Sequence, residues 1–222
     1  MTTRTAAFVI LVLIGTALAA SLLLYSSLPA RMPTHWNMHG EVNGWSGRPF
    51  ASLALPALML IILLFLLAGD WLSPLHFKVG AFRSAFNYLM VIVAALMFYI
   101  HGLALAAALH PGHPYGRWMV GGMFIFFAWL GNMLGKTRRN FWIGIRTPWT
   151  LASDSVWIAT HRLGARVFMV MGITGAIAIA LGISPVWCFV LILAGIFYPV
   201  FYSLWLSKKL EHQEKRVDER ED

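Results

Sequence analysis

The stretch Ala51-Ser-Leu-Ala-Leu-Pro-Ala-Leu-Met-Leu-Ile-Ile-Leu-Leu-Phe-Leu-Leu-Ala-Gly69 contains no charged side chain. A helix needs about 20 apolar residues to cross a hydrocarbon layer of roughly 30 Å, and this stretch has nearly that length. Comparable runs lie on both sides of it. We therefore expect an all-α integral membrane protein with six transmembrane helices, near Ala6–Leu28, Ala51–Gly69, Ser84–Leu109, Trp118–Leu134, Val167–Ile183 and Val186–Leu206.

The composition of the whole chain supports a membrane protein. Of its 222 residues 59% are hydrophobic and only 12% are charged, with a mean hydropathy of +0.70. Soluble domains carry roughly a quarter charged residues. The formal net charge of +8 arises between and after the apolar runs, which indicates contacts with the lipid bilayer and excludes a direct nucleic-acid function. The single cysteine, Cys188, lies in an apolar run and is expected to be a buried, inert thiol.

The distribution of basic residues predicts the orientation. Fourteen of the 17 Lys and Arg residues fall at the N-terminus, in the second and fourth connections and in the tail. The other three are Arg31, Arg48 and Arg117, in the first and third connections. The positive-inside rule then places both termini in the cytoplasm. We expect the first run to be retained as a helix rather than cleaved as a signal peptide.

We divide the chain into three parts. Residues 1–110 form a three-helix part that contains an ordered extracytoplasmic loop at residues 29–50. Residues 111–210 form a second three-helix part, which contains a polar cytoplasmic segment at residues 140–164, here called the polar block. Residues 211–222 form a charged cytoplasmic tail.

The extracytoplasmic loop is rich in Pro, Gly, Trp and His. Its Pro residues prevent a continuing helix, and Asn43-Gly44 is typical of a turn between two short extended segments. One interpretation is a structural cap in which His35 and Asn37 bond the loop backbone. Another is a recognition surface for an extracellular ligand, with Trp36 and Trp45 as amphipathic anchors.

A third interpretation of this loop is a metal site formed by His35, His39 and Glu41. Imidazole and carboxylate are common ligands of zinc. The H-x-x-x-H spacing, however, lacks the Glu that follows the first His in helical metalloproteases. The metal site stays an open alternative at this stage.

The polar block begins Asn140-Phe-Trp-Ile-Gly-Ile-Arg-Thr-Pro-Trp-Thr-Leu151. Thr147-Pro148 breaks the chain, and Ser153 is a good N-cap for a following helix. From its spacing we expect an amphipathic helix that lies in the membrane interface between the fourth and fifth spans. Such a helix could be a connector that seals the bundle, or a docking or gating element.

Carboxylates are too scarce for an ordinary enzyme active site. Six of the nine lie in the last twelve residues, which leaves only Glu41, Asp70 and Asp154. No paired carboxylates, nucleophile elbow or phosphate-binding loop are present in the sequence. We therefore predict no catalytic residues, no cofactor and no enzymatic activity.

Two polar residues fall inside the third span. For Asn87 and His101 we expect either a hydrogen bond to a neighbouring helix or, for His101, a role in the passage of a ligand or proton. Small residues at Gly131 and Gly135, and at Gly172 and Ala176, allow close helix approach, either within the bundle or in a homodimer.

The polar block resembles the signature of the SdpI family, bacterial polytopic membrane proteins named for an immunity protein against a secreted killing peptide. The resemblance rests on Phe141-Trp-Ile-Gly-Ile-Arg-Thr-Pro-Trp-Thr-Leu151, Val156-Trp157 and Thr160-His161-Arg162-Leu163-Gly164. The outer loop, from Leu28-Pro29 through Pro33-x-His35-x-Asn37 to Gly40 and Gly44, is similar to an accessory domain often found ahead of that signature.

The resemblance implies a protein of the bacterial inner membrane that confers resistance to a secreted antimicrobial peptide. It also implies a receptor that holds a cytosolic winged-helix repressor at the membrane. The alternative is a small transporter or a metal-dependent membrane enzyme. The residues expected to bind a ligand or partner are His35, Trp36, Asn37, Arg146, Thr147, Pro148, Trp149, Trp157, His161 and Arg162.

Overall fold

The computed structural model describes residues 1–72, 79–140 and 142–221. Lys78 of the charge count, Phe141 of the signature and Asp222 of the tail lie outside the described residues. The elements are α1 (Thr3–Leu24), η1 (Tyr25–Ser27), β1 (Arg31–Trp36), β2 (Val42–Gly47), α2 (Arg48–Leu72), η3 (Val79–Phe82), α3 (Arg83–Leu109), α4 (Tyr115–Leu134), α5 (Pro148–Ala152), α6 (Asp154–Ala180) and α7 (Pro185–Glu221).

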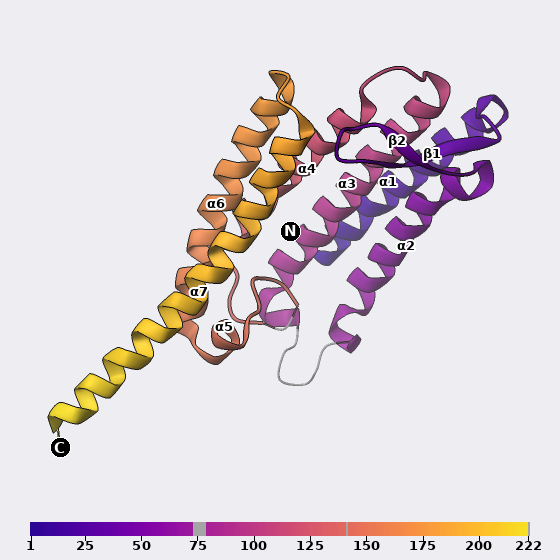
Figure 1. Cartoon of the computed structure of the whole chain (residues 1–222). Helices are drawn as coiled ribbons and strands as arrows, with labels where there is room; N and C mark the ends of the chain where they lie inside the picture. The colour runs from indigo at the N-terminus through magenta and orange to yellow at the C-terminus, as the bar shows by residue number, and fades with distance from the viewer. Residues whose placement is uncertain (73–78, 141, 222) are drawn as a thin grey trace.

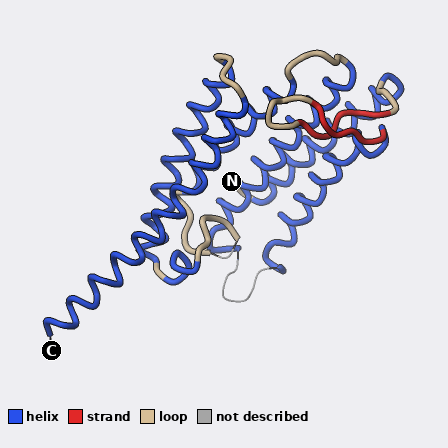
Figure 2. Tube along the Cα trace, in the orientation of Figure 1, coloured by secondary structure: helices blue, strands red, loops and turns tan. Residues whose placement is uncertain are grey.

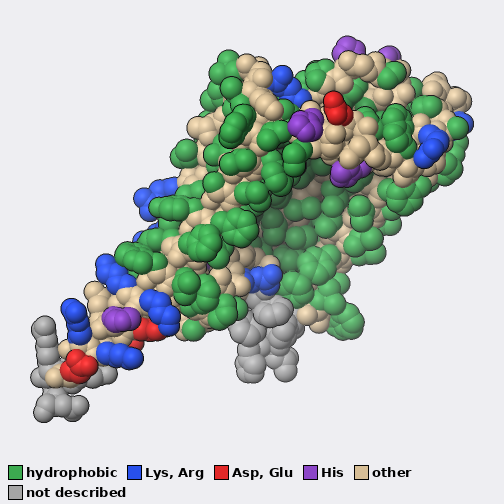
Figure 3. Space-filling view, viewed as in Figure 1, with side chains coloured by type: hydrophobic (Ala, Val, Ile, Leu, Met, Phe, Trp, Pro, Cys, Tyr) green, Lys and Arg blue, Asp and Glu red, His purple; other side chains and the backbone are tan. Residues whose placement is uncertain are grey.

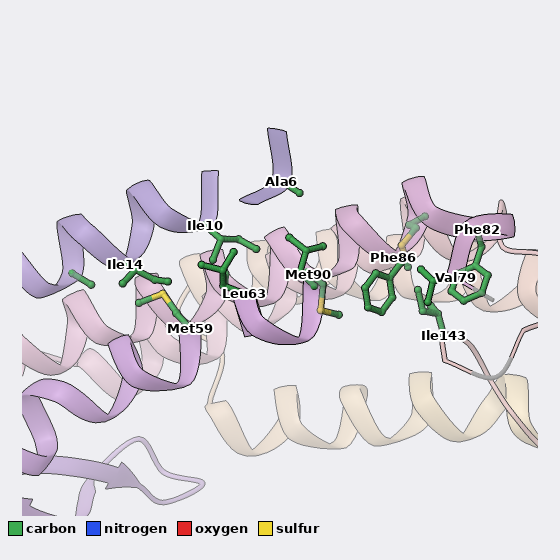
Figure 4. Close-up of a cluster of buried hydrophobic side chains, with 14 residues drawn as sticks. Ala6, Ile10, Ile14, Met59, Leu63, Val79, Phe82, Phe86, Met90 and Ile143 are labelled. Carbon is green, nitrogen blue, oxygen red and sulfur yellow. The ribbon is translucent and has the colours of Figure 1, made fainter. Parts of the chain in front are cut away.

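The long helices form two groups that meet at α4 (Figure 1). α1, α2 and α3 pack against one another, while α4 packs on α3 and most extensively on α6, which in turn packs on α7. The first group encloses one cluster of buried apolar side chains, which includes Ile10, Met59 and Phe86 (Figure 4). The second encloses another, which includes Phe124 and Phe168.

Five of the described helices are long and apolar enough to cross a membrane: α1, α2, α3, α6 and α7. The predicted all-α membrane fold is confirmed at this level. The predicted fourth span corresponds to α4, which is not among these five. The β hairpin lies at one end of α1, α2 and α3 (Figure 2). The loop that follows α4 lies at the opposite end of the molecule.

The predicted extended segments form an antiparallel β hairpin, residues 31–47, across one end of the bundle (Figure 2). The predicted turn position is wrong. Arg31 pairs with Gly47 and Trp36 with Val42, so the chain turns at residues 37–41 and Gly44 lies within β2, opposite His35. A side-chain oxygen of Asn37 makes this turn, because it accepts the backbone N–H groups of two later residues.

The predicted interfacial helix is also wrong. α6 runs without interruption from Asp154 to Ala180, and only the five residues of α5 form a separate helix before it. Gly164 therefore does not end a helix. A Cβ atom there would lie 3.0 Å from Ile145 Cδ1 and 3.1 Å from Leu134 Cδ2, so glycine permits α4 and the preceding loop to pack closely on α6.

Glycines also set the distance between α4 and α6. A Cβ atom on Gly131 would lie 2.7 Å from the backbone nitrogen of Met169, and one on Gly172 would lie 2.5 Å from that of Ala128. The small-residue faces therefore pack within the bundle, which confirms the intramolecular interpretation. In this fold the same faces are not available for a homodimer.

Candidate functional site

The polar block begins with a turn built around Asn140, whose side chain is buried. Its Oδ1 atom accepts the backbone N–H groups of Trp142 and Ile143, at 2.8 and 2.7 Å. Its Nδ2 atom donates to the carbonyl oxygens of Arg138 and Ile143, at 2.8 and 3.1 Å. One side chain thus makes four hydrogen bonds to this loop, which fixes the loop's path after α4.

A buried His–Trp pair on α6 anchors the middle of the block. His161 Nδ1 donates to the carbonyl of Trp157 at 2.8 Å, and Nε2 accepts the backbone N–H of Ile145 at 3.0 Å. The two rings stack with centroids 3.9 Å apart, and Trp157 Nε1 donates to the carbonyl of Thr137 at 3.0 Å. Because the Ile145 amide needs an acceptor, its hydrogen bond fixes the neutral His161 tautomer with its proton on Nδ1.

Gly144 passes directly over this ring. Its φ is +128°, a conformation that side chains rarely adopt, and a Cβ atom would collide with His161 Nε2. The Gly144 in the sequence Ile-Gly-Ile thus permits the close approach of loop and helix.

The Thr147-Pro148 break starts α5 rather than a long helix. Thr147 and Thr150 form a capping box, with Pro148 in the first turn, and Thr150 Oγ1 also donates to the Ile145 carbonyl at 2.8 Å. Trp149 Nε1 donates to Ser203 Oγ at 2.6 Å, which ties α5 to α7.

An ion pair joins the residue just before the block to the start of α6. Arg139 Nε lies 2.9 Å from Asp154 Oδ1, and Arg139 also donates to the carbonyl of Leu151 at 2.8 Å. Ser153 is the N-cap of α6, as predicted.

The block contacts both apolar cores. Ile143 lies in the core of α1 to α3 (Figure 4), and Trp142 meets Phe65 of α2 edge to face, with ring centroids 5.2 Å apart. Ile145, two residues later, packs against the core of α4, α6 and α7. This bridging position was missed by reasoning from the sequence, because local spacing does not show which core an apolar loop residue joins.

The predicted binding residues of the block fall into two sets. Arg146, Pro148 and Arg162 are exposed. Trp157 and His161 are 1% exposed, and Thr147 and Trp149 are half-buried. Trp157 and His161 therefore cannot touch a partner while the block keeps this structure. Trp157 and His161 would act by holding the block in place.

The predicted residues of the hairpin lie mostly at the surface. His35 is exposed and its Nδ1 atom is 2.5 Å from Asn43 Oδ1, whereas Trp36 and Asn37 are half-buried. Sequence reasoning missed Asn43 and Met38, which is 54% exposed, since their neighbours become evident only from the register. Asn37 bonds the loop backbone, whereas His35 contacts the side chain of Asn43.

The metal alternative fails for the described residues. Among them no group of three or more His, Cys, Asp and Glu is arranged to hold a metal ion. Glu41 Oε2 instead accepts Asn37 Nδ2 at 3.1 Å, and His35 faces Asn43. Glu41 thus contacts the turn residue Asn37, and His35 makes a cross-strand contact.

The two polar residues of α3 bond to α1. His101 Nε2 lies 2.9 Å from Ser21 Oγ, and Ser21 donates to the carbonyl of Ser52 at 2.7 Å. Asn87 Nδ2 donates to Thr3 Oγ1 at 3.2 Å. Both side chains are buried, so both serve helix packing in this fold. The role of His101 in ligand or proton passage stays a prediction.

These features define a multi-pass membrane protein in which a folded polar segment joins two helix groups. Residues 136–203 match the SdpI/YfhL protein family, and residues 12–60 match a domain of unknown function, DUF1648. The first match takes in the polar block, and the second takes in the β hairpin.

A curated relative extends the similarity over most of the chain. The chain is 26% identical over 162 residues to the Immunity protein SdpI of Bacillus subtilis (strain 168), an alignment that covers 73% of this chain and 75% of the relative. No solved structure matches. The chain therefore carries the SdpI family signature behind a DUF1648 segment, and the predicted resemblance is confirmed.

Proposed function

We propose that the protein protects the bacterium that makes it from a secreted, membrane-active peptide, and that it does so without enzymatic chemistry. The observation that carries this proposal is the similarity to an immunity protein over 73% of the chain. The scarcity of carboxylates in the body of the chain agrees with a role in binding rather than catalysis.

The proposal includes a topology of six spans with both termini in the cytoplasm. α4 has 20 residues, a length of about 30 Å at 1.5 Å per residue, which matches the hydrocarbon layer. In Figure 3 most of the visible Lys and Arg side chains gather toward the end of the molecule that carries the C-terminus. That distribution supports a cytoplasmic position for the polar block and an outer position for the hairpin.

We assign peptide contact to the hairpin in the first part, residues 1–110. Trp45 and Met38 are 52% and 54% exposed, and His35 lies on the same hairpin. Exposed aromatic and Met side chains suit a hydrophobic peptide, because they give large contact areas.

We assign a signalling role to the polar block in the second part, residues 111–210. Its exposed residues Arg146 and Arg162 lie on a rigid loop and helix and would face a cytosolic winged-helix repressor. The contact of the block with both cores supports this role, since a displacement in one helix group would reach the block directly.

The test is survival of a sensitive bacterium that expresses the protein and is challenged with a killing peptide. Trp45→Ala with His35→Ala should lower protection at least about tenfold, because the central anchors of an interface carry most of its binding energy. Trp71→Ala, which removes a still more exposed tryptophan at the far end of α2, is the control. Unchanged survival with the double variant would contradict the hairpin assignment.

The signalling role is tested separately with a reporter of the repressor. Arg146→Ala with Arg162→Ala should abolish peptide-dependent induction and leave the protein in the membrane. Lys215→Ala with Arg216→Ala, which removes the same charge from α7, should not. Loss of induction in both double variants would show a general effect of charge. Intact induction in both would contradict the proposed signalling role of the polar block.

A further inference from the structure

A cavity of about 520 Å³ opens where α3 begins and α4 ends, apart from the hairpin and from the exposed residues of the polar block. Phe82, Ser84 and Tyr88 line it from the α3 side, and Met133 and Lys136 from the α4 side. Because these residues lie at helix ends, the cavity lies at the boundary between the apolar helices and the water at this end of the molecule.

The walls of this cavity are positively charged. Arg83, Lys136 and Arg138 line it, and none of its described lining residues is Asp or Glu. Arg83 pairs with Asp70, but no carboxylate of the described residues pairs with Lys136 or Arg138. The N-terminal ammonium of Met1, which donates to Ser84 Oγ, also lines the cavity. Among the described residues, Lys136, Arg138 and this ammonium have no carboxylate partner.

Two further features suit an anionic group. The first residues of α3 line the cavity, and the N-cap residue Phe82 makes no side-chain hydrogen bond to that helix end, so the positive end of the helix dipole lies beside the cavity. Ser84 and Tyr88 add neutral hydroxyl groups beside the cations. The site thus offers charge and hydrogen-bond donors from the start of α3 and from the loop that follows α4.

The remaining walls are apolar, which decides between a soluble anion and a lipid. Phe82, Ala85 and Met133 lie beside the cations in the same cavity. A free phosphate ion has no group to place against them, whereas a phospholipid has a glycerol backbone and the first carbons of its acyl chains. The boundary position favours the lipid for the same reason.

We propose that this cavity binds the headgroup of an anionic phospholipid, with its phosphate between Lys136 and Arg138. A phosphatidylglycerol headgroup keeps its full negative charge. The choline of phosphatidylcholine would bring a cation toward Lys136 and Arg138 and bind more weakly. The proposal goes beyond protection and signalling, because it requires neither a peptide nor a repressor.

The experiment is native mass spectrometry of the full chain released from detergent, titrated with three probes. These are dioctanoyl phosphatidylglycerol, dioctanoyl phosphatidylcholine and glycerol phosphate. Phosphatidylglycerol should remain bound to the wild-type protein at least about tenfold more tightly than either other probe. Lys136→Gln with Arg138→Gln should remove this preference, since each cation contributes about 1 kcal/mol near a surface, and 1.4 kcal/mol is tenfold in affinity.

The matched control is Lys215→Gln with Arg216→Gln, which replaces the same residue types with the same change of charge on the exposed end of α7. It should keep the preference for phosphatidylglycerol. Equal binding of phosphatidylglycerol by wild type and the cavity variant would overturn the proposal. Binding of glycerol phosphate as tight as that of the lipid would also overturn it, in favour of a soluble phosphate ligand.

A measurement without variants keeps the proposal testable if the cavity variant does not fold. Binding of phosphatidylglycerol to the wild type should weaken markedly as the salt concentration in the test buffer rises from about 0.05 to about 0.5 M, because ions screen exposed charge pairs (Debye length about 10 Å at 0.1 M). Binding of phosphatidylcholine should change little over the same range. Binding that does not respond to salt would contradict the electrostatic site. Loss of protection with intact lipid binding would disprove the proposed function alone.

Discussion

The β hairpin and the polar block use Asn and His in similar ways, but they differ in how deeply these residues are buried. In each, an Asn side-chain oxygen accepts two backbone N–H groups and so makes a turn: Asn37 in the hairpin and Asn140 in the block. In each, a His bonds a neighbouring segment. His35 is exposed and faces a side chain, whereas His161 is 1% exposed and bonds the backbone through both ring nitrogens.

The difference shows that burial, rather than residue type, decides whether such a residue can contact a partner or instead stabilises the fold. A buried polar group is costly unless each of its hydrogen-bonding atoms has a partner, so removing one in the polar block leaves others unsatisfied. In the hairpin, water can replace a lost partner. Paired substitutions in the two regions should therefore differ in their effect on stability.

The largest difference is expected between Gly144→Ala and Gly47→Ala. At Gly144 the new Cβ would collide with His161 and the φ of +128° would be strained, while at Gly47 the nearest atom is 3.9 Å away. We expect Gly144→Ala to lower the free energy of unfolding by about 3 kcal/mol or more, or to prevent folding, and Gly47→Ala to change it by less than about 1 kcal/mol. Melting temperatures of the purified proteins in detergent measure both. Equal stability of the two variants would refute the packing of the loop on α6.

A smaller difference is expected between His161→Ala and His35→Ala. The first removes a stacked, buried ring and leaves the Ile145 amide without its acceptor, at a cost of about 2–4 kcal/mol. The second removes an exposed ring, at a cost of about 0.5 kcal/mol. Chemical unfolding followed by Trp fluorescence reports both values. A His35→Ala variant as unstable as His161→Ala would show that the hairpin contributes to stability as much as the polar block does, and would contradict the comparison.

The smallest difference is expected between Asn140→Ala and Asn37→Ala. Both lose the side-chain oxygen that makes the turn, but only Asn140 is nearly fully buried, at 2% exposure. We expect a loss of about 2 kcal/mol for Asn140→Ala and about 1 kcal/mol for Asn37→Ala. Hydrogen exchange of the turn amides provides the measurement: those of Trp142 and Ile143 should lose more protection than those of His39 and Glu41. The reverse order would contradict the comparison.

The helices could be predicted from the sequence because lipid imposes a simple rule on length and composition. The runs beginning near Ala6, Ala51, Ser84 and Val186 each fall within an observed helix that is long and apolar enough to span. Close helix approach at Gly131 and Gly172 was also predicted, because small residues let helix backbones approach each other, but the structure was needed to show that α4 and α6 are the helices that meet.

The turns and the helix boundary could not be predicted, because long-range contacts decide them. Asn43-Gly44 is a strong local signal for a turn, yet the hydrogen bonds of Asn37 move the turn to residues 37–41 and leave Gly44 opposite His35. Gly164 favours the end of a helix when it is considered alone. Its neighbours on α4 and α7 show instead that it is a contact point within α6.

The position of the candidate site in the chain could be predicted. Which of its residues are exposed and which are buried could not. The motif from Asn140 to Gly164 identified the block, yet nothing in its spacing separates exposed Arg162 from buried His161 next to it. That separation depends on which side of α6 faces the loop. The same limit applies to Lys136 and Arg138, whose cavity exists only because α3 and α4 meet there.

The position of Ile143 in the first core has a consequence for biogenesis. Helices α1, α2 and α3 are synthesised first, but the apolar cluster they enclose also includes Ile143, with Trp142 packed against it. That cluster is therefore incomplete until α4 and the loop after it have left the ribosome. A chain released after residue 110 would leave Phe65 without its aromatic neighbour Trp142, and such a fragment should be a preferred substrate of membrane proteases.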